Sequence, residues 1–492
     1  MFGPANPSRA TKYRVADFGP PHVWSDPIPI SPTHIYSSSL PRPVPKIVFA
    51  SFILFMATLP FEAAHLGLAT GFLSVAKLSG VAFIVCFFFY FNPLSGKRGL
   101  PPVSTALVCF LAYLVVYLMN GLFLSSHLIG SFANLFTTLT QLLIVFWVSS
   151  SLLQHENIAR AALLTFALMS LLLGVATLLE MPGFSNTLET GAGQRLTTLD
   201  YNPNVLATNM ALSAIVLMGL QLGTMFRPGW QKWLIVLLMA PALGVIVQTG
   251  SRAGLIACVL GFAVFLFSER RSVPMSKGCV VIFVILGIGV LAYLVAFNPM
   301  AWNRLQDVYD GHLSGRQRIH QAAIEMFQEK PIFGWQPVAL WQELGRRVGL
   351  FAGTRDAHNL FLHLVLEVGL LGAAPFLLGL WFCLRSAWKA RFGPLGVLPL
   401  AMFTAVLFAN LSHTLLTRKP FWLVLALCLA AQESSRRRYW MYAPTASNRF
   451  RRFDKPPYGA MYSAAPGNQS DEPSAGASFR RASFEPGTLS AL

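Results

Sequence analysis

The stretch GCVVIFVILGIGVLAYLVAF, residues 278–297, decides the class of fold. It contains no charged residue, and about 20 apolar residues suffice to carry a helix across the bilayer core. The whole chain has the same bias, since 54% of its 492 residues are hydrophobic and only 12% are charged. Soluble domains are about 45–50% apolar and about 25% charged. The composition therefore excludes a soluble enzyme and an extended disordered or collagen-like chain.

Similar apolar runs recur through the central part of the chain. They predict about twelve transmembrane helices, at residues 47–61, 73–91, 102–119, 128–150, 158–179, 203–222, 231–248, 252–267, 278–297, 358–384, 395–411 and 420–432. We therefore expect an all-α, polytopic membrane region over residues 47–432, with one large loop at residues 298–357 that contains short helices. The six cysteines lie in or beside the runs and read as buried thiols rather than disulfides.

Basic residues indicate which way the runs face. Every second connection carries Lys or Arg, at Lys97/Arg98, Arg160, Arg227/Lys232, Arg270/Arg271/Lys277, Arg385/Lys389/Arg391 and Arg436–Arg438. Such residues stay on the cytoplasmic side of a membrane, and an even number of spans places both tails there. Residues 1–46 and 433–492 are rich in Pro, Gly and Ser and are expected to be disordered cytoplasmic tails, the second of them basic and close to anionic lipid headgroups.

The net charge of +17 indicates positive-inside bias or an anionic ligand rather than nucleic acid. Arg195, Arg252 and the loop 298–357 carry positive charge on the opposite side, which breaks the pattern. Basic residues in such places are candidates for binding an anion. For the loop as a whole, a mixed-charge surface with no ligand is an equally good interpretation.

The segment Gln248-Thr-Gly-Ser-Arg-Ala-Gly254 is a break between two apolar runs. Gly250 permits a tight turn, and Ser251 is expected to cap the following helix. Arg252 then lies in the first helical turn, where the helix dipole disfavours a cation unless an anion shares the site with the free backbone N–H groups. The alternative is an Arg252 side chain that reaches to the headgroups.

Two further arginines have similar surroundings. Arg316 follows Ser314 and Gly315, with Ser314 as the expected N-cap of an amphipathic helix that ends before Pro331. Arg195 precedes the turn Asn202-Pro203-Asn204 at the start of the sixth run, where an ordinary helix start with an exposed arginine is the alternative.

The fourth candidate segment, Asp356-Ala-His358-Asn359, begins the tenth run, which also contains Glu367. A histidine at a membrane surface titrates near neutral pH and can act as a base, although a structural histidine remains an alternative. A carboxylate such as Glu367 within a span is a functional candidate, or else braces a helix contact. Three arginines and a histidine on one face suit a lipid-linked diphosphate, whose charge guanidinium groups neutralise without a metal.

In this order, these segments resemble the O-antigen ligase and O-antigen polymerase superfamily of bacterial envelope proteins. The motifs that carry the resemblance are Arg195 with Asn202-Pro203-Asn204-Val-Leu-Ala, Thr249-Gly250-Ser251-Arg252, Ser314-Gly315-Arg316 with Pro331-Ile-Phe-Gly334, and His358-Asn359 with Glu367-Val-Gly369-Leu-Leu-Gly372. The chain departs from the family's pattern in the Leu-Thr-Thr-Leu-Asp stretch after Arg195 and at His320, and both departures concern the acceptor.

The resemblance implies an O-antigen ligase-like domain at residues 47–432 of a bacterial inner-membrane protein, with the loop 298–357 and the active site on the periplasmic side. It implies an inverting glycosyltransferase that takes a glycan from undecaprenyl diphosphate without a metal or other cofactor. Arg195, Arg252 and Arg316 would bind the donor diphosphate, and His358 would activate the acceptor hydroxyl. Ser251, Ser314, Asn359 and Glu367 would support them.

Several functions stay open. A ligase would use lipid A-core or a similar acceptor, whereas an O-antigen or exopolysaccharide polymerase would use another lipid-linked repeat unit and need a partner that sets chain length. A secondary transporter is a second class, although the chain has no clear internal repeat. A third reading keeps the glycosyl transfer but makes Glu62, just after the first run, the base in place of His358.

Overall fold

The computed structural model describes residues 44–62, 74–90, 101–190, 193–199, 201–222, 230–268, 277–309, 316–349 and 354–442. The chain divides into two compact units at Arg438, and the first unit contains the apolar helices and the candidate site. Ser314 and most residues of the two predicted tails lie outside the described residues.

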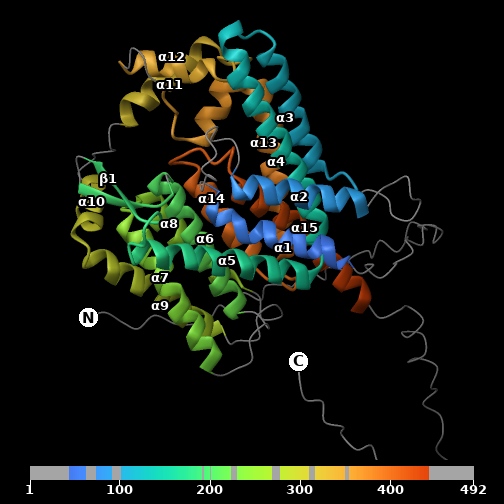
Figure 1. The fold of residues 1–492 in the computed structure, drawn as a ribbon, viewed down its shortest axis with the longest axis vertical. Helices are drawn as coiled ribbons and strands as arrows, with labels where there is room; N and C mark the ends of the chain where they lie inside the picture. Colours follow the sequence, from blue (N-terminus) through green and yellow to red (C-terminus); the bar gives the residue numbers. More distant parts are fainter. Residues whose placement is uncertain are drawn as a thin grey trace, which may run out of the picture. The chain divides into compact units, whose positions relative to one another are not determined.

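Each predicted apolar run forms a helix (Figure 1). These helices are α1 Lys46–Thr58, α2 Val75–Tyr90, α3 Thr105–Gly121, α4 Ile129–Leu152, α5 Glu156–Leu178, α6 Pro203–Leu222, α7 Trp230–Gln248, α8 Arg252–Val264, α9 Lys277–Ala296, α13 Leu360–Ala390, α14 Leu398–Ala409 and α15 Lys419–Tyr442. α15 continues past the boundary predicted at residue 432, and an ion pair between Glu433 and Arg436 lies on its extension.

Within the described residues, five helices are long and apolar enough to cross a membrane. They are Ser126–Leu152, which includes α4, and α5, α6, α9 and α13. α1, α2, α3, α8 and α14 are shorter apolar helices, as is the part of α7 from Leu237. The helical membrane fold is therefore confirmed in its class, and twelve crossings remain a prediction.

Helix α6 forms the centre of one group of helices, because α5, α7, α8 and α14 all pack against it. A helix that is apolar on every side belongs in such an interior, and nearly all of α6 is buried. α8 approaches it closely where a Cβ added to Gly254 would lie 2.5 Å from the Cβ of Ala207. Small residues at this crossing bring the first turns of α6 and α8 together, and both turns carry residues of the motifs described in the sequence.

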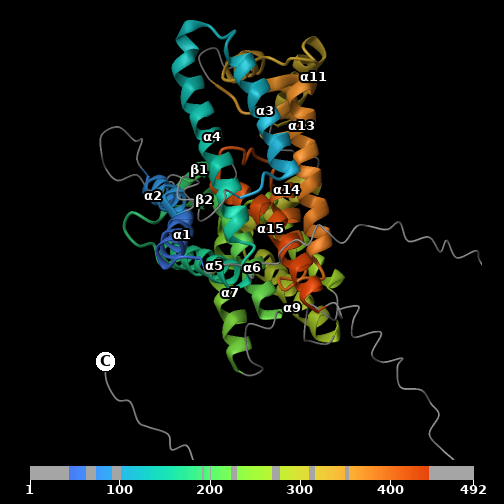
Figure 2. The same cartoon turned by 90° about the vertical axis from the view of Figure 1, so that its right-hand side faces the viewer.

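Helix α13 pairs with α3, and the two views show them side by side with α4 (Figures 1 and 2). The tenth predicted run, residues 358–384, lies mostly within α13, which is a candidate membrane span. Gly369, with φ of 63° and ψ of −171°, interrupts this helix, a break that the sequence did not predict. The loop after α11 fills this break. Leu370 N donates to Pro331 O at 2.9 Å, and Trp335 N donates to Leu366 O.

The segment 298–357 contains three short helices, α10 Pro299–Tyr309, α11 Arg316–Glu329 and α12 Ala339–Arg347. α11 and α12 share a small apolar core with α13 that includes Ile319, Met326 and Leu366. Arg347 pairs with both Glu329 and Glu343, which joins the two short helices at their polar side. The short helices expected in this segment are therefore present, and its periplasmic location remains a prediction.

A two-stranded antiparallel hairpin precedes α6, formed by β1 Asn186–Thr190 and β2 Gly193–Thr197. The sequence predicted only a helix start here. The difference matters because Arg195 lies in β2 opposite Leu188, and β2 packs against α6 and α7. A strand therefore presents this arginine to the helix ends.

Candidate functional site

Asn204, in the first turn of α6, joins two of the predicted motifs. Its Oδ1 accepts a hydrogen bond from Arg195 Nη2 at 3.2 Å and another from Ser251 Oγ at 2.9 Å. The Asn204 backbone N–H donates to Asn202 Oδ1 at 2.9 Å, which closes an Asx turn at the helix start. The short polar residues of this motif therefore hold an arginine and a helix cap in place.

The turn from Thr249 to Arg252 has the predicted geometry. Gly250 has φ of 57°, and Ser251 caps α8 by accepting from Gly254 N at 3.2 Å, so the predicted N-cap is confirmed. Arg252 is the first residue of α8. Thr249 O accepts from Arg195 Nε at 2.9 Å. The hairpin arginine is thus bound to the same turn that starts α8.

Arg195 is only 9% exposed. Burial and the positive charges of Arg304, Arg316 and Arg252 lower its pKa to about 10, so it remains cationic at neutral pH. Within the described residues, its hydrogen bonds go to neutral groups and it forms no ion pair. A buried cation without a counter-charge is costly, and an anionic ligand would remove that cost.

Arg304 on α10 is a fourth arginine in this group. In the sequence, Arg304 is one of several charges in the loop 298–357 and has no separate predicted role. A Cβ added to Gly250 would lie 3.1 Å from Arg304 Cδ, so its side chain lies against the Thr249–Arg252 turn. Arg304 also lowers the pKa of Arg195 and of Arg316 by charge repulsion. Arg304 belongs to none of the four sequence motifs, so the sequence offers no signal that would have identified it as a site residue.

Arg316, the first residue of α11, donates from Nη1 to Ser412 Oγ at 2.7 Å. Burial, followed by the charges of Arg252 and Arg304, lowers its pKa. The four arginines come from β2, α8, α10 and α11, and their mutual repulsion shows that these four elements bring them together. The structure therefore assembles the three predicted arginines and adds Arg304.

His358 lies just before α13 with a left-handed backbone, φ of 51°. Asn359 caps the helix by accepting from Phe361 N at 2.9 Å and Leu362 N at 3.3 Å. Burial is the main cause of the lowered pKa of His358, and the charge of Arg316 adds to it, whereas Asp356 opposes it. The ring is therefore neutral at neutral pH, as a general base must be, and its coupling to Arg316 places it beside the arginine group.

The connection between α14 and α15 contributes three neighbouring side chains to the site. Ser412 binds Arg316, His413 Nε2 lies 3.4 Å from Thr208 Oγ1 of α6, and Thr414 Oγ1 donates to Asp356 Oδ1 at 3.2 Å. Burial and Arg316 lower the pKa of His413 to about 3, so it stays neutral. These three residues were not predicted from the sequence, because short polar side chains in a tight turn show no periodicity.

Glu367 lies deeper in α13 and is 2% exposed. Its Oε2 lies 3.5 Å from His363 Nε2 and 3.5 Å from the hydroxyl of Tyr113 on α3. His363 Nδ1 in turn lies 3.5 Å from Asp356 Oδ1. Among the described residues, these contacts link Glu367 to His358 through His363 and Asp356.

Glu62, the alternative base, is occupied elsewhere. Its Oε1 accepts from Lys419 Nζ at 2.5 Å, and the two side chains are 10% and 13% exposed. This ion pair joins the segment that follows α1 to the start of α15. This contact gives Glu62 a structural explanation.

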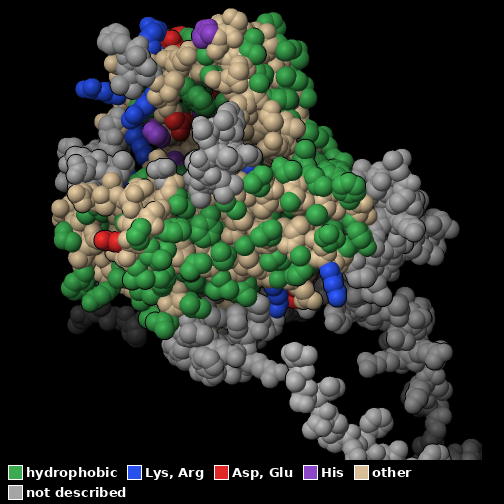
Figure 3. Space-filling model, in the orientation of Figure 1, with side chains coloured by type: hydrophobic (Ala, Val, Ile, Leu, Met, Phe, Trp, Pro, Cys, Tyr) green, Lys and Arg blue, Asp and Glu red, His purple; other side chains and the backbone are tan. Residues whose placement is uncertain are grey.

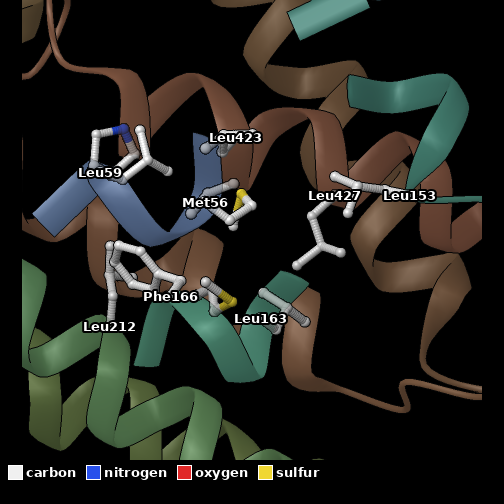
Figure 4. A pocket seen from close by; sticks show the side chains of 11 residues that line it. Met56, Leu59, Leu153, Leu163, Phe166, Leu212, Leu423 and Leu427 are labelled. Atoms are coloured by element: carbon white, nitrogen blue, oxygen red, sulfur yellow. The ribbon is translucent and has the colours of Figure 1, made fainter. Parts of the chain in front are cut away.

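Basic, acidic and histidine side chains gather in a hollow below α11 and α12, whereas the surface beneath it is mainly apolar (Figure 3). A separate apolar cavity of about 20 Å³ lies among α1, α5, α6 and α15, lined by residues such as Met56, Phe166 and Leu427 (Figure 4). A volume of this size is about that of one water molecule and is far too small for a lipid chain.

Together, the apolar helices and this group of arginines define a multi-pass membrane protein with an arginine-lined polar site at the ends of helices and of strand β2. Comparison with known families gives a match to O-Antigen ligase over residues 234–377. The match confirms the resemblance to the O-antigen ligase and polymerase superfamily and supports a ligase- or polymerase-like role in surface polysaccharide biosynthesis. The matched region contains Arg252, Arg304, Arg316 and His358, and Arg195 precedes it. No curated protein matches the chain.

Proposed function

We propose that this protein is an inverting membrane glycosyltransferase that transfers a glycan from undecaprenyl diphosphate to an acceptor, as an O-antigen ligase does. The observation that carries the proposal is the grouping of Arg195, Arg252, Arg304 and Arg316 beside His358. Guanidinium groups bind diphosphate oxygens in a forked geometry. Four of them at partly buried positions form a site for a group with several negative charges.

In the proposed reaction, His358 Nε2 accepts the proton of the acceptor hydroxyl. The hydroxyl oxygen attacks the anomeric carbon from the side opposite the diphosphate, so the configuration inverts. The bond between that carbon and the diphosphate oxygen breaks, and the diphosphate leaves with the electron pair. The arginines stabilise the charge that develops on the leaving group, and this step requires no metal.

We place the protein in the bacterial inner membrane with both tails cytoplasmic and the site periplasmic, following the distribution of Lys and Arg between connections. The lipid part of the donor would then remain in the bilayer. The acceptor, lipid A-core or another glycan, would approach His358 from the aqueous side, where its side chain is 26% exposed.

The reaction is tested with purified protein in lipid nanodiscs, a lipid-linked glycan donor and candidate acceptors. We expect His358→Ala and Arg316→Ala each to reduce transfer at least about 100-fold, with Glu62→Gln as a matched control that retains turnover per folded molecule. An active His358→Ala variant together with an inactive Glu62→Gln variant would overturn the assignment of the base.

The acceptor class is tested in a deletion strain by separating the envelope glycans by size and attachment. Long polymers left on the lipid carrier, with bare acceptor, identify a ligase. Single repeat units identify a polymerase, which would use the same site. Unchanged glycans would contradict both and favour a transporter.

A further inference from the structure

Asp356 lies between two histidines. Its Oδ2 is 3.7 Å from His358 Nδ1, and its Oδ1 is 3.5 Å from His363 Nδ1. Thr414 Oγ1 donates to the same Oδ1 at 3.2 Å. Because Oδ1 faces His363 and Thr414, the carboxylate is turned so that Oδ2 faces His358.

The backbone around His358 is fixed, but its ring requires a partner. Leu360 N donates to Asn410 O at 2.8 Å, and Asn359 caps α13, so the positive φ of His358 is held by the helix start that follows. Residues in this backbone region persist only where their surroundings enforce it. Among the described residues, Asp356 is the carboxylate that lies within ion-pair distance of the ring.

Contacts behind Asp356 keep it in place. His363 is almost fully buried, and its other ring nitrogen, Nε2, lies 3.5 Å from Glu367 Oε2. Thr414 belongs to the connection that also holds Arg316 through Ser412. The position of Asp356 is thus set by α13 on one side and by the 412–414 turn on the other.

We propose that Asp356 is a positioning residue for His358, and that Thr414 holds its carboxylate in the required orientation. This inference rests on the proposed function, in which His358 is the base. Asp356 would accept from Nδ1–H, which fixes the tautomer that leaves Nε2 unprotonated toward the acceptor. Geometry of this kind tightens when substrate binds, so the 3.7 Å separation is short enough to close.

In the transfer step, His358 Nε2 takes the acceptor proton and the ring becomes an imidazolium. The Asp356 carboxylate stabilises that charge and does not itself take the proton. The proton then passes from the partly exposed ring to water, and His358 returns to its neutral form. Asp356 therefore acts only through His358.

The electrostatic surroundings of His358 give this role a distinct signature. The ring is surrounded by Asp356 and by four groups that are or can become positive, namely Arg316, Arg355, His320 and His413. Asp356 is the group that favours the imidazolium. Its removal lowers the pKa of His358 further, and the acid limb of the kcat/KM profile moves to lower pH.

The test compares Asp356→Asn and Thr414→Val with Glu325→Gln, which changes an exposed acid on α11. Each full-length variant is assayed in nanodiscs across a pH series, with thermal melting as a check of folding. We expect Asp356→Asn to reduce kcat about 10- to 100-fold, while its KM for donor stays within about threefold of the wild-type value. The acid limb of its kcat/KM profile should move to lower pH. Thr414→Val should move the acid limb in the same direction by a smaller amount, and Glu325→Gln should leave the acid limb and kcat unchanged.

The double variant Asp356→Asn, Thr414→Val should be no slower than Asp356→Asn alone, because Thr414 acts through Asp356. A folded Asp356→Asn variant with wild-type kcat and an unmoved acid limb would overturn the inference while leaving His358 as the base. A slow variant whose acid limb is unmoved would also overturn it, since that result indicates a structural role. An active His358→Ala variant would instead overturn the proposed function.

Discussion

Replacing Gly369 with alanine should disrupt the contact between α13 and the loop after α11 and lower the stability of the protein. The φ of 63° and ψ of −171° at this position suit glycine alone, and another residue there costs about 1–3 kcal/mol. The added Cβ would lie 2.0 Å from Ile332 O and 2.6 Å from Phe333 N. These are backbone atoms, so the loop itself would have to move.

Movement of the loop would break the bonds that fill the helix break, from Leu370 N to Pro331 O and from Leu371 N to Ile332 O. Each buried backbone group left without a partner costs about 1–3 kcal/mol. Together with the backbone strain, we expect a loss of about 3–9 kcal/mol.

The loss can be measured as the temperature at which purified protein in detergent ceases to be monodisperse. Gly289→Ala is the matched control, because Gly289 lies within helix α9 with no atom within 4 Å of its added Cβ. It should be neutral or stabilise by about 0.5–1 kcal/mol. If the Gly369→Ala and Gly289→Ala variants melt at the same temperature, the helix is not broken at Gly369 and residues 331–335 do not fill a break there.

Three further results are expected. Asn204→Leu removes the acceptor of both Arg195 and Ser251 and should raise the donor KM about tenfold or more, measured by initial rates against donor concentration. Glu62→Gln leaves Lys419 nearly buried without its counter-charge and should cost about 3 kcal/mol or more in a melting assay, and Lys419→Met in the same chain should restore part of it. The pKa of His358 lies below its ordinary value of 6.5, so its neutral form persists below that pH. The midpoint of the acid-side fall in kcat/KM, measured across a pH series, should therefore lie below pH 6.5, and a midpoint above pH 6.5 would contradict this assignment.

The helices could be predicted from the sequence because each depends on a local run of apolar residues. The same holds for Ser251, whose capping bond reaches only to Gly254. The break at Gly369 could not be predicted, since its filling comes from Pro331–Trp335 on a different element. Glycine within an apolar run reads equally well as a small residue at a helix crossing.

Arg304 and Asp356 illustrate the other limit of prediction. Arg304 lies among loop charges of both signs, and nothing in its immediate sequence separates it from a solvated surface residue. Asp356 lies in a candidate segment, but the sequence there indicates a role for His358 and none for the aspartate. Arg304 gains significance from lying against Gly250, and Asp356 from lying beside His358 and Thr414. These contacts join separate elements, so only the tertiary structure reveals them.

The motifs that carry the family resemblance divide into two physical kinds. In Thr249–Arg252, the small residues bind neighbouring elements and Arg252 supplies the charge. Pro331–Gly334 and Glu367–Gly369 instead meet each other through backbone contacts, and a Cβ added to Gly334 would lie 2.6 Å from Leu366 O. A substitution at these glycines can therefore abolish activity without touching the donor, which means that loss of activity identifies a binding residue only when the variant is shown to remain folded.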